Sequence, residues 1–200
     1  MRRRGSSSLL AVLLLAGCAV ATAEQPPPAD GPPPFAHCAE VTQPPSAAGT
    51  PPGGDGGGAS ELPAIELPCF VDGQPVRVDA IRGPAVINLW ASYCAPCRVE
   101  LPAFQRLSQR LGDRLHVIGV DTYDGREAAR SIGEDFGLTF PTLYDRDAVL
   151  QSTLGRGAVL PMTVFVDGNG RIRHVDTSGA LDDEALSTLV ARHLDIEGDL

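Results

Sequence analysis

Two cysteines separated by two residues are the part of this chain best suited to chemistry. Cys94 and Cys97 follow an apolar run, Val86–Ala91, and precede a helical pattern, so they lie where a strand passes into a helix. At a helix N-terminus the first cysteine faces unpaired N–H groups and the positive end of the helix dipole, which favour its thiolate. Pro96 is tolerated there because its missing N–H would have had no intrahelical acceptor. The pair therefore predicts thiol–disulfide redox chemistry.

The two cysteines are expected to play different parts. Cys94 is assigned as the nucleophile, because the first cysteine of such a pair is nearer to solvent and to the helix end. Cys97 lies beneath it and resolves the mixed disulfide. Two alternatives remain, a static disulfide or half of a zinc site, and zinc would need two further ligands such as Cys38 and Cys69. Since there is no second CxxC and no histidine cluster, we expect no metal and no cofactor.

Hydrophobic periodicity predicts the elements that position this pair. The run Val86–Ala91 is typical of a buried central strand. Apolar residues then follow one helical face up to Gly112, which supplies a stop. The next strand is expected over 115–120. It is followed by Asp124 and, three residues later, Glu127, the spacing of a capping box at the start of another helix.

Turn signals predict two hairpins in the remainder. Asp167-Gly168-Asn169-Gly170 separates two apolar stretches, and Val71-Asp72-Gly73-Gln74 does the same earlier in the chain. A final helix is expected to start near Asp182. Strand, helix, strand, helix, hairpin and helix in this order predict an α/β fold with a mixed central sheet flanked by helices and an N-terminal β-hairpin addition.

The stretch Trp90–Pro102, which holds the CxxC and then Glu100-Leu101-Pro102, resembles the thioredoxin superfamily and, within it, the extracytoplasmic TlpA/ResA branch. The strand, the aromatic residues, the helix and the Glu-Leu-Pro all agree, whereas a bare CxxC would be weak. The resemblance covers roughly residues 61–195 and implies a thioredoxin fold with thiol–disulfide oxidoreductase activity. Asn88 takes the place of a buried acid of cytosolic thioredoxins and is expected to be a hydrogen-bonded core amide.

The resemblance also assigns further site residues. Pro161 matches the position of the family's cis-proline, and a cis bond there would leave the Leu160 backbone open to an extended substrate. Glu100 corresponds to an acidic residue of the ResA branch that tunes the thiols. The alternative for Glu100 is an exposed first-turn glutamate that stabilises the helix dipole. Trp90 and Tyr93 are expected to shape the rim of the site, where either could contact a partner.

The first residues are typical of an export signal. Three arginines precede an apolar run that is too short to span a bilayer and that ends in Leu15-Ala16-Gly17-Cys18. These four residues resemble the bacterial lipobox, so we expect residues 1–17 to be a lipoprotein signal peptide and Cys18 to be lipidated. The alternative is an ordinary secretory signal cleaved after Ala23. Lipid anchoring predicts a location on the extracytoplasmic face of the bacterial cell membrane.

A change in composition separates this signal from the domain. Residues 18–60 are rich in proline and glycine and are expected to form a tether, with the thioredoxin-like domain over 61–200. Cys38 and Cys69 remain after the lipid cysteine and the active pair are set aside. An even number of cysteines in an oxidising compartment suggests a structural disulfide between them, and two independent thiols are the alternative.

The charge of the chain and its resemblance to a family together limit the kinds of partner that we expect. Sixteen basic and twenty-five acidic side chains, with a net charge of -9, argue against nucleic acid. Resemblance to ResA-like proteins implies reduction of protein disulfides such as those of apocytochrome c, with electrons from a membrane thiol transporter of the CcdA or DsbD kind. The alternatives are an oxidant that introduces disulfides into secreted proteins and a non-catalytic binding module. The dipeptide Ala95-Pro96 does not decide the direction of electron flow.

Overall fold

A mixed sheet of six strands forms the centre of the domain. The structure is a computed structural model that describes residues 34–48 and 60–196. The strand order is β1–β8–β7–β4–β5–β6. These strands are β1 Ser60–Glu61, β4 Ala85–Trp90, β5 His116–Thr122, β6 Thr142–Asp145, β7 Met162–Val166 and β8 Arg171–Asp176. The strands β4, β5 and β6 run parallel, and β7, β8 and β1 are each antiparallel to their neighbours, which confirms the mixed sheet.

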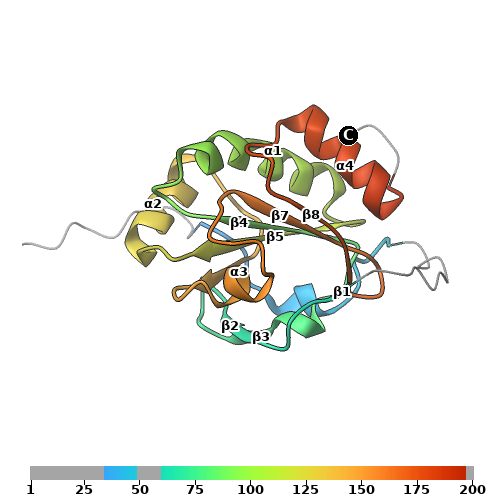
Figure 1. The fold of residues 1–200 in the computed structure, drawn as a ribbon, viewed down its shortest axis with the longest axis horizontal. Helices are drawn as coiled ribbons and strands as arrows, with labels where there is room; N and C mark the ends of the chain where they lie inside the picture. The colour runs from blue at the N-terminus through green and yellow to red at the C-terminus, as the bar shows by residue number, and fades with distance from the viewer. Residues whose placement is uncertain (1–33, 49–59, 197–200) are drawn as a thin grey trace, which may run out of the picture. The chain divides into compact units, whose positions relative to one another are not determined.

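Helices and a small hairpin cover the two faces of this sheet. The helices are α1 Ala95–Leu111, α2 Arg126–Asp135, α3 Val149–Thr153 and α4 Asp183–Leu194. Helices α1 and α4 contact each other on one side of the sheet, whereas α3 and the hairpin lie on the other side (Figure 1). The hairpin consists of β2 Glu66–Pro68 and β3 Pro75–Arg77 in antiparallel pairing, as the turn signal predicts. The expected fold class is therefore confirmed.

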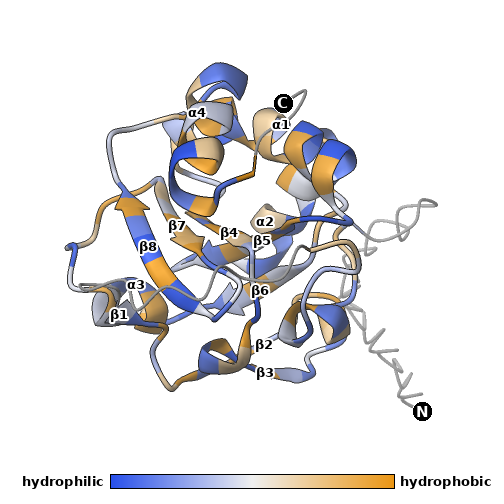
Figure 2. Cartoon of the chain, turned by 90° about the vertical axis from the view of Figure 1, so that its right-hand side faces the viewer, coloured by the Kyte–Doolittle hydropathy of each residue, from blue (hydrophilic) through white to orange (hydrophobic). Residues whose placement is uncertain are grey.

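Two apolar layers, one on each face of the sheet, stabilise the fold. Along β4, Val86 and Trp90 point into the layer beneath α1, whereas Ile87 and Leu89 point into the opposite layer. Side chains alternate along a strand, so a strand between two such layers must be apolar on both faces. Figure 2 shows the complementary pattern on α1 and α4, where hydrophobic and hydrophilic residues share each helix. Each large aliphatic side chain buried in this way contributes about 1.5–3 kcal/mol.

Helix α1 ends where the sequence predicts, but not by the expected cap. The residue after Leu111 is Gly112, and its φ of -60° is right-handed, whereas a glycine cap is usually left-handed. A Cβ on Gly112 would lie 2.6 Å from the carbonyl oxygen of Ser108. Glycine is needed at this position because the chain passes close to the last helical turn.

Residues 34–48 are part of the folded unit, although the sequence placed them in the tether. Val41 is fully buried, and Phe35 is 5% exposed. The N–H of Phe35 donates to the carbonyl oxygen of Leu138 at 2.9 Å. Burial of these apolar side chains opposes the entropy lost on ordering the segment. The tether expected over residues 18–60 is therefore interrupted by a packed segment.

Other expectations fall on residues that the structure does not describe. The signal peptide over 1–17, the lipidated Cys18 and the remaining tether residues lie outside the described ranges. Within residues 34–48 and 60–196, none of the helices combines the length and the apolar character that crossing a bilayer requires.

Candidate active site

The cysteine pair lies at the point where β4 passes into α1. Cys94 is the N-cap of the helix, and its Sγ accepts a hydrogen bond from the N–H of Cys97 at 3.2 Å. The two sulfurs form a disulfide with an S–S distance of 2.03 Å. Cys94 is 8% exposed and Cys97 is fully buried, so the outer sulfur belongs to Cys94. A thiolate at Cys94 would keep the N–H contact and face the positive end of the helix dipole.

The rim of the pair differs from expectation at one position. Tyr93, the residue before Cys94, is 63% exposed and presents its ring to solvent beside the nucleophile. Trp90, by contrast, is fully buried, and its ring centroid lies 6.1 Å from that of Phe35. The expectation that Trp90 shapes the rim is wrong, because its side chain points into the layer beneath α1. Tyr93 lies beyond the end of β4, so its side chain is not held on one face of the sheet and is exposed.

The neighbouring strand brings the expected proline to the site. The Leu160–Pro161 peptide bond is cis. In the antiparallel register of β4 and β7, Leu89 faces Met162, so Pro161 lies next to the end of β4 from which the active-site loop leaves. Leu160 is half-buried. A second cis bond, Gly83–Pro84, lies just before β4 and carried no signal in the sequence.

Glu100 lies one helical turn beyond Cys97 and is 1% exposed. Its Oε1 accepts a hydrogen bond from Asn88 Nδ2 at 2.7 Å, and its Oε2 accepts one from the N–H of Leu181 at 3.0 Å. Burial raises the pKa of Glu100 to about 7, although these two hydrogen bonds act in the opposite direction. The alternative of an exposed first-turn glutamate is thus wrong. The expected hydrogen-bonded core amide at Asn88 is confirmed.

Asp124 holds the active-site loop and does not cap a helix as the sequence suggested. Helix α2 has Gly125 as its N-cap, without a side-chain cap. The Asp124 carboxylate instead accepts from the N–H of Ser92 at 2.5 Å, from the Ser92 hydroxyl at 2.9 Å and from the N–H of Gly125 at 2.7 Å. Capping geometry is local, whereas Ser92 is thirty-two residues away in the chain, so sequence spacing could not indicate this contact.

Sequence reasoning missed Asp121, a second buried acid close to the site. It lies in β5, is fully buried, and neither of its carboxyl oxygens has a hydrogen-bond partner. An acid that directly follows an apolar strand pattern was the one available signal. Among the residues that the structure describes, no group of three or more histidine, cysteine, aspartate or glutamate side chains could hold a metal ion.

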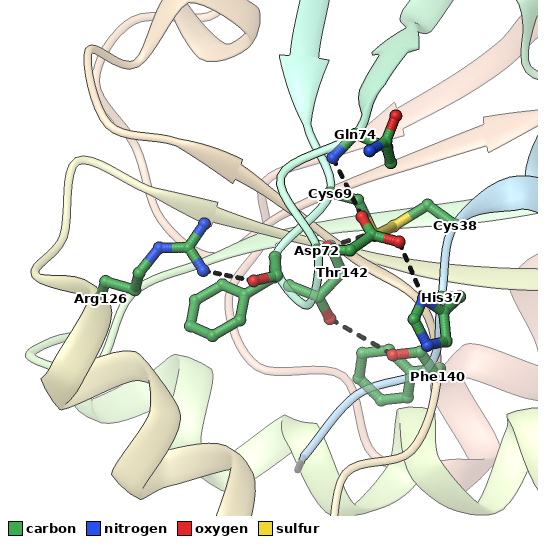
Figure 3. Close-up of a disulfide and its surroundings, with 9 residues drawn as sticks. His37, Cys38, Cys69, Asp72, Gln74, Arg126, Phe140 and Thr142 are labelled. Carbon is green, nitrogen blue, oxygen red and sulfur yellow. Dashed lines mark hydrogen bonds and ion pairs between the residues drawn. A yellow bond between two sulfur atoms is a disulfide. The ribbon is translucent and has the colours of Figure 1, made fainter.

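The two other cysteines within residues 34–48 and 60–196 form a second disulfide (Figure 3). Cys38 and Cys69 are joined with an S–S distance of 2.04 Å, and both are buried. Beside them, the ring of His37 pairs with the carboxylate of Asp72 at 2.8 Å. Sulfurs bonded to each other do not bind zinc, so in this state the pair cannot complete a metal site with the CxxC.

A disulfide at the N-terminus of the helix that follows a central strand, with a cis-proline just before the adjacent strand, defines a protein of the thioredoxin-fold class. The chain belongs to the AhpC/TSA family, whose model matches residues 59–175.

Curated relatives match about half of the chain. The thiol-disulfide oxidoreductase ResA of Geobacillus thermodenitrificans is 31% identical over 111 residues, which cover 54% of this chain and 62% of the relative. The thiol:disulfide interchange protein DsbE of Escherichia coli is 37% identical over 106 residues, which cover 51% of this chain and 55% of the relative. The chain thus spans less than two thirds of the length of these two relatives.

Solved structures share the fold. A secreted Mycobacterium tuberculosis disulfide oxidoreductase, homologous to E. coli DsbE, superimposes with a TM-score of 0.58 at 22% identity, covering 64% of this chain and 96% of that one. A DsbF homologue from Corynebacterium diphtheriae gives a TM-score of 0.61 at 25% identity, covering 74% and 99%. Both likenesses show the thioredoxin fold.

Proposed function

We propose that the chain is a thiol–disulfide oxidoreductase that reduces disulfides of protein substrates through Cys94 and Cys97, outside the cytoplasm. The observation that carries this proposal is the arrangement of the two sulfurs. The outer one lies at the N-terminus of α1 and is partly accessible, and the inner one is fully buried beneath it. Relatives named thiol-disulfide oxidoreductase and thiol:disulfide interchange protein match about half of the chain.

The reaction follows from this arrangement in two exchange steps. The Cys94 thiolate attacks a substrate disulfide, which forms a mixed disulfide and releases one substrate thiolate. Cys97 then loses its proton and attacks the Cys94 sulfur, which closes the protein disulfide and releases the second substrate thiolate. The substrate gains two electrons and the protein loses two, so a reductant must restore the dithiol.

Glu100 is suited to accept the proton that the inner thiol, Cys97, loses. It lies one helical turn from Cys97, and its pKa of about 7 lets it exchange a proton near neutral pH. Asn88 and the N–H of Leu181 fix both carboxylate oxygens, so the group is held in place while it titrates. A nearby carboxylate also disfavours the thiolate by charge repulsion.

An extended segment of the substrate would lie along the exposed rim. Tyr93 offers an accessible ring before Cys94, and the half-buried Leu160 precedes the cis-proline Pro161. Backbone pairing at Leu160 would bind many sequences, because main-chain hydrogen bonds do not depend on side-chain identity.

The finer proposal concerns partners and location. We infer membrane tethering through Cys18, apocytochrome c as a substrate, and a CcdA- or DsbD-type thiol transporter as the source of electrons. An oxidant of secreted proteins is the competing function. Thioredoxin-like pairs span roughly -270 to -120 mV, a difference of about 7 kcal/mol for two electrons, so the potential decides between the two directions.

Trapping tests the mechanism. Cys97→Ser, expressed in cells, should accumulate mixed disulfides through Cys94, because the second exchange step has lost its thiol. Cys94→Ser is the matched control and should give at least about tenfold less conjugate, since the buried thiol does not reach substrates. Conjugates are separated without reductant and identified by mass spectrometry. Equal trapping by both variants would contradict the assignment of the nucleophile.

A redox titration of the CxxC then tests the direction. A potential near the thioredoxin end, with cytochrome c precursors among the trapped proteins, supports the reductase. A potential near -120 mV, with reduced secreted proteins trapped instead, would replace it with the oxidant.

A further inference from the structure

The unpartnered carboxyl group of Asp121 requires an explanation. The side chain is fully buried, and neither oxygen has a partner within hydrogen-bonding geometry. A buried carboxylate without donors is strongly destabilised, so the group is retained in its neutral form unless something nearby compensates the charge.

The neighbours of Asp121 in the sheet do not provide that compensation. In the register of the parallel strands, Asp121 lies between Trp90 of β4 and Tyr144 of β6, so the three side chains face the same side. Phe35 and Phe70 link these flanking rings, with centroid distances of 6.1 Å from Phe35 to Trp90 and 6.0 Å from Phe70 to Tyr144. Aromatic side chains therefore flank Asp121 on both neighbouring strands.

The charged groups around Asp121 come from three elements, and most of them oppose its ionisation. The carboxylates of Asp124, in the following loop, and of Asp145, in β6, both disfavour a second negative charge. Arg126 of α2 acts in the other direction, but its guanidinium is engaged with the carbonyl oxygen of Phe70 and lies over the Phe70 ring. Burial outweighs Arg126 and, together with Asp124, raises the pKa of Asp121 to about 8.

Asp124 is joined to the active-site loop and to β6 by several hydrogen bonds. Its carboxylate accepts three hydrogen bonds, two of them from Ser92, and its carbonyl oxygen accepts one from the Tyr144 hydroxyl at 3.0 Å. Between the two acids, Tyr123 has a φ of 52°, which is unusual for a residue other than glycine. Such strained backbone is retained where the surrounding structure requires a particular geometry.

The same acids act on the active-site loop. Burial raises the pKa of Tyr93, and the negative charges of Asp124 and Asp121 raise it further. Tyr93 lies between Ser92, which Asp124 holds, and the nucleophile Cys94. Asp124 thus contacts the loop that carries the reactive sulfur, through its hydrogen bonds with Ser92.

We propose that Asp121 is a positioning residue whose buried carboxyl group stays protonated, so that no second negative charge lies beside the carboxylate of Asp124, which holds Ser92 and the Cys94 loop in place. This inference rests on the proposed function of Cys94. Ionisation of Asp121 adds a second negative charge beside Asp124 in a buried setting. The resulting repulsion weakens the hydrogen bonds between Asp124 and Ser92. The reactivity of Cys94 then depends on pH through Asp121, although Asp121 does not contact Cys94.

A titration of the full chain tests the protonation directly. In protein labelled with carbon-13 at the aspartate carboxyl carbons, the signal assigned to Asp121 by loss in Asp121→Asn should titrate near pH 8. Asp124→Asn should move this titration downward by about one unit or more, because it removes the like charge. An Asp121 signal that titrates in the ordinary range of aspartates, near pH 4, would overturn the proposal.

The pH profile of Cys94 alkylation tests the link to the site. The reduced wild-type protein should show an additional step near pH 8 beyond the thiol titration, and Asp121→Asn should lose it while Cys94 still reacts. Glu127→Gln is the matched control, because Glu127 is an exposed acid in the first turn of α2, and it should keep the step. An unchanged profile in Asp121→Asn would overturn the positioning role.

The two proposals fail in different ways. A wild-type protein that exchanges no disulfides would refute the oxidoreductase function, yet the carboxyl titration would still decide the protonation of Asp121. An active enzyme in which Asp121 is ionised at neutral pH would refute only the inference on Asp121.

Discussion

Glu100 and Asp121 show how hydrogen bonding distinguishes two acids that are equally removed from water. Glu100 receives donors on both oxygens, from Asn88 and from the N–H of Leu181, whereas Asp121 receives none. Burial raises both pKa values, to about 7 for Glu100 and about 8 for Asp121. Donors stabilise the charged form, so Glu100 is suited to exchanging a proton and Asp121 to keeping one.

Glu100→Gln should lower the apparent pKa of the active-site thiols. The substitution removes a negative charge one helical turn from Cys97, and with it the repulsion of the thiolate and a proton acceptor. A downward shift of roughly one unit is expected in the pH dependence of thiol absorbance or alkylation. An upward shift would mean that Glu100 does not act on the thiols through its charge.

The same variant has a consequence for stability. As the pH rises above about 4.5, the carboxyl of Glu100 ionises in the unfolded chain but stays protonated in the folded protein up to about pH 7. The wild-type free energy of unfolding should therefore fall over this interval, by at most about 3 kcal/mol. In Glu100→Gln this contribution to the fall should be absent. Denaturant unfolding at several pH values measures the difference.

At the scale of elements, the segment before β1 is attached to the domain by three kinds of contact. The Cys38–Cys69 disulfide joins it to the β2–β3 hairpin, as Figure 3 shows. Phe35 packs on α2, where a Cβ at Gly133 would come within 2.6 Å of the Phe35 ring. Phe35 also contacts Phe70, with ring centroids 4.9 Å apart. The segment thus covers aromatic residues close to the active-site strand.

Replacement of both Cys38 and Cys69 by alanine should lower the free energy of unfolding by about 3–4 kcal/mol. The disulfide closes a loop with a sequence separation of 31, and its loss increases the entropy of the unfolded chain. Denaturant unfolding under non-reducing conditions measures the change, with the active pair left intact.

Peptide mapping of the wild-type protein is the control for this prediction. The cross-link between Cys38 and Cys69 should persist after mild reduction of Cys94–Cys97, because both of its sulfurs are buried. Free, alkylated thiols at both positions in the native protein would contradict it.

At the scale of the whole molecule, Cys18→Ser should release the protein from membranes. Cys18 ends the lipobox-like sequence Leu15-Ala16-Gly17-Cys18, and two or three acyl chains make attachment stable where one chain would be marginal. Fractionation of cells, together with the mass of the mature protein, measures the loss of the anchor.

The mature mass of the wild-type protein separates the alternatives. A lipid-modified N-terminus at residue 18 supports the anchor, whereas cleavage after Ala23 would identify an ordinary secretory signal. Membrane retention and mass that are unchanged in the variant would contradict lipidation.

The sequence by itself determined the elements and the reactive pair, because both depend on local patterns. The apolar run Val86–Ala91, the spacing of Cys94 and Cys97, and the turn signal at 167–170 each act over a few residues. The resemblance around the CxxC added the position of Pro161, which chain proximity alone could not supply.

Tertiary structure alone decided what surrounds those elements. Asp124 fits a capping pattern locally, but its carboxylate binds Ser92, which follows the neighbouring strand β4. Trp90 is absent from the rim because its side chain points into the core at its position in β4. Phe35 lies in a proline-rich stretch yet packs on α2, since one large apolar side chain can outweigh the composition around it. Asp121 is buried between Trp90 and Tyr144, which belong to the two neighbouring strands. Burial and charge proximity are properties of segments far apart in sequence, so no local pattern encodes them.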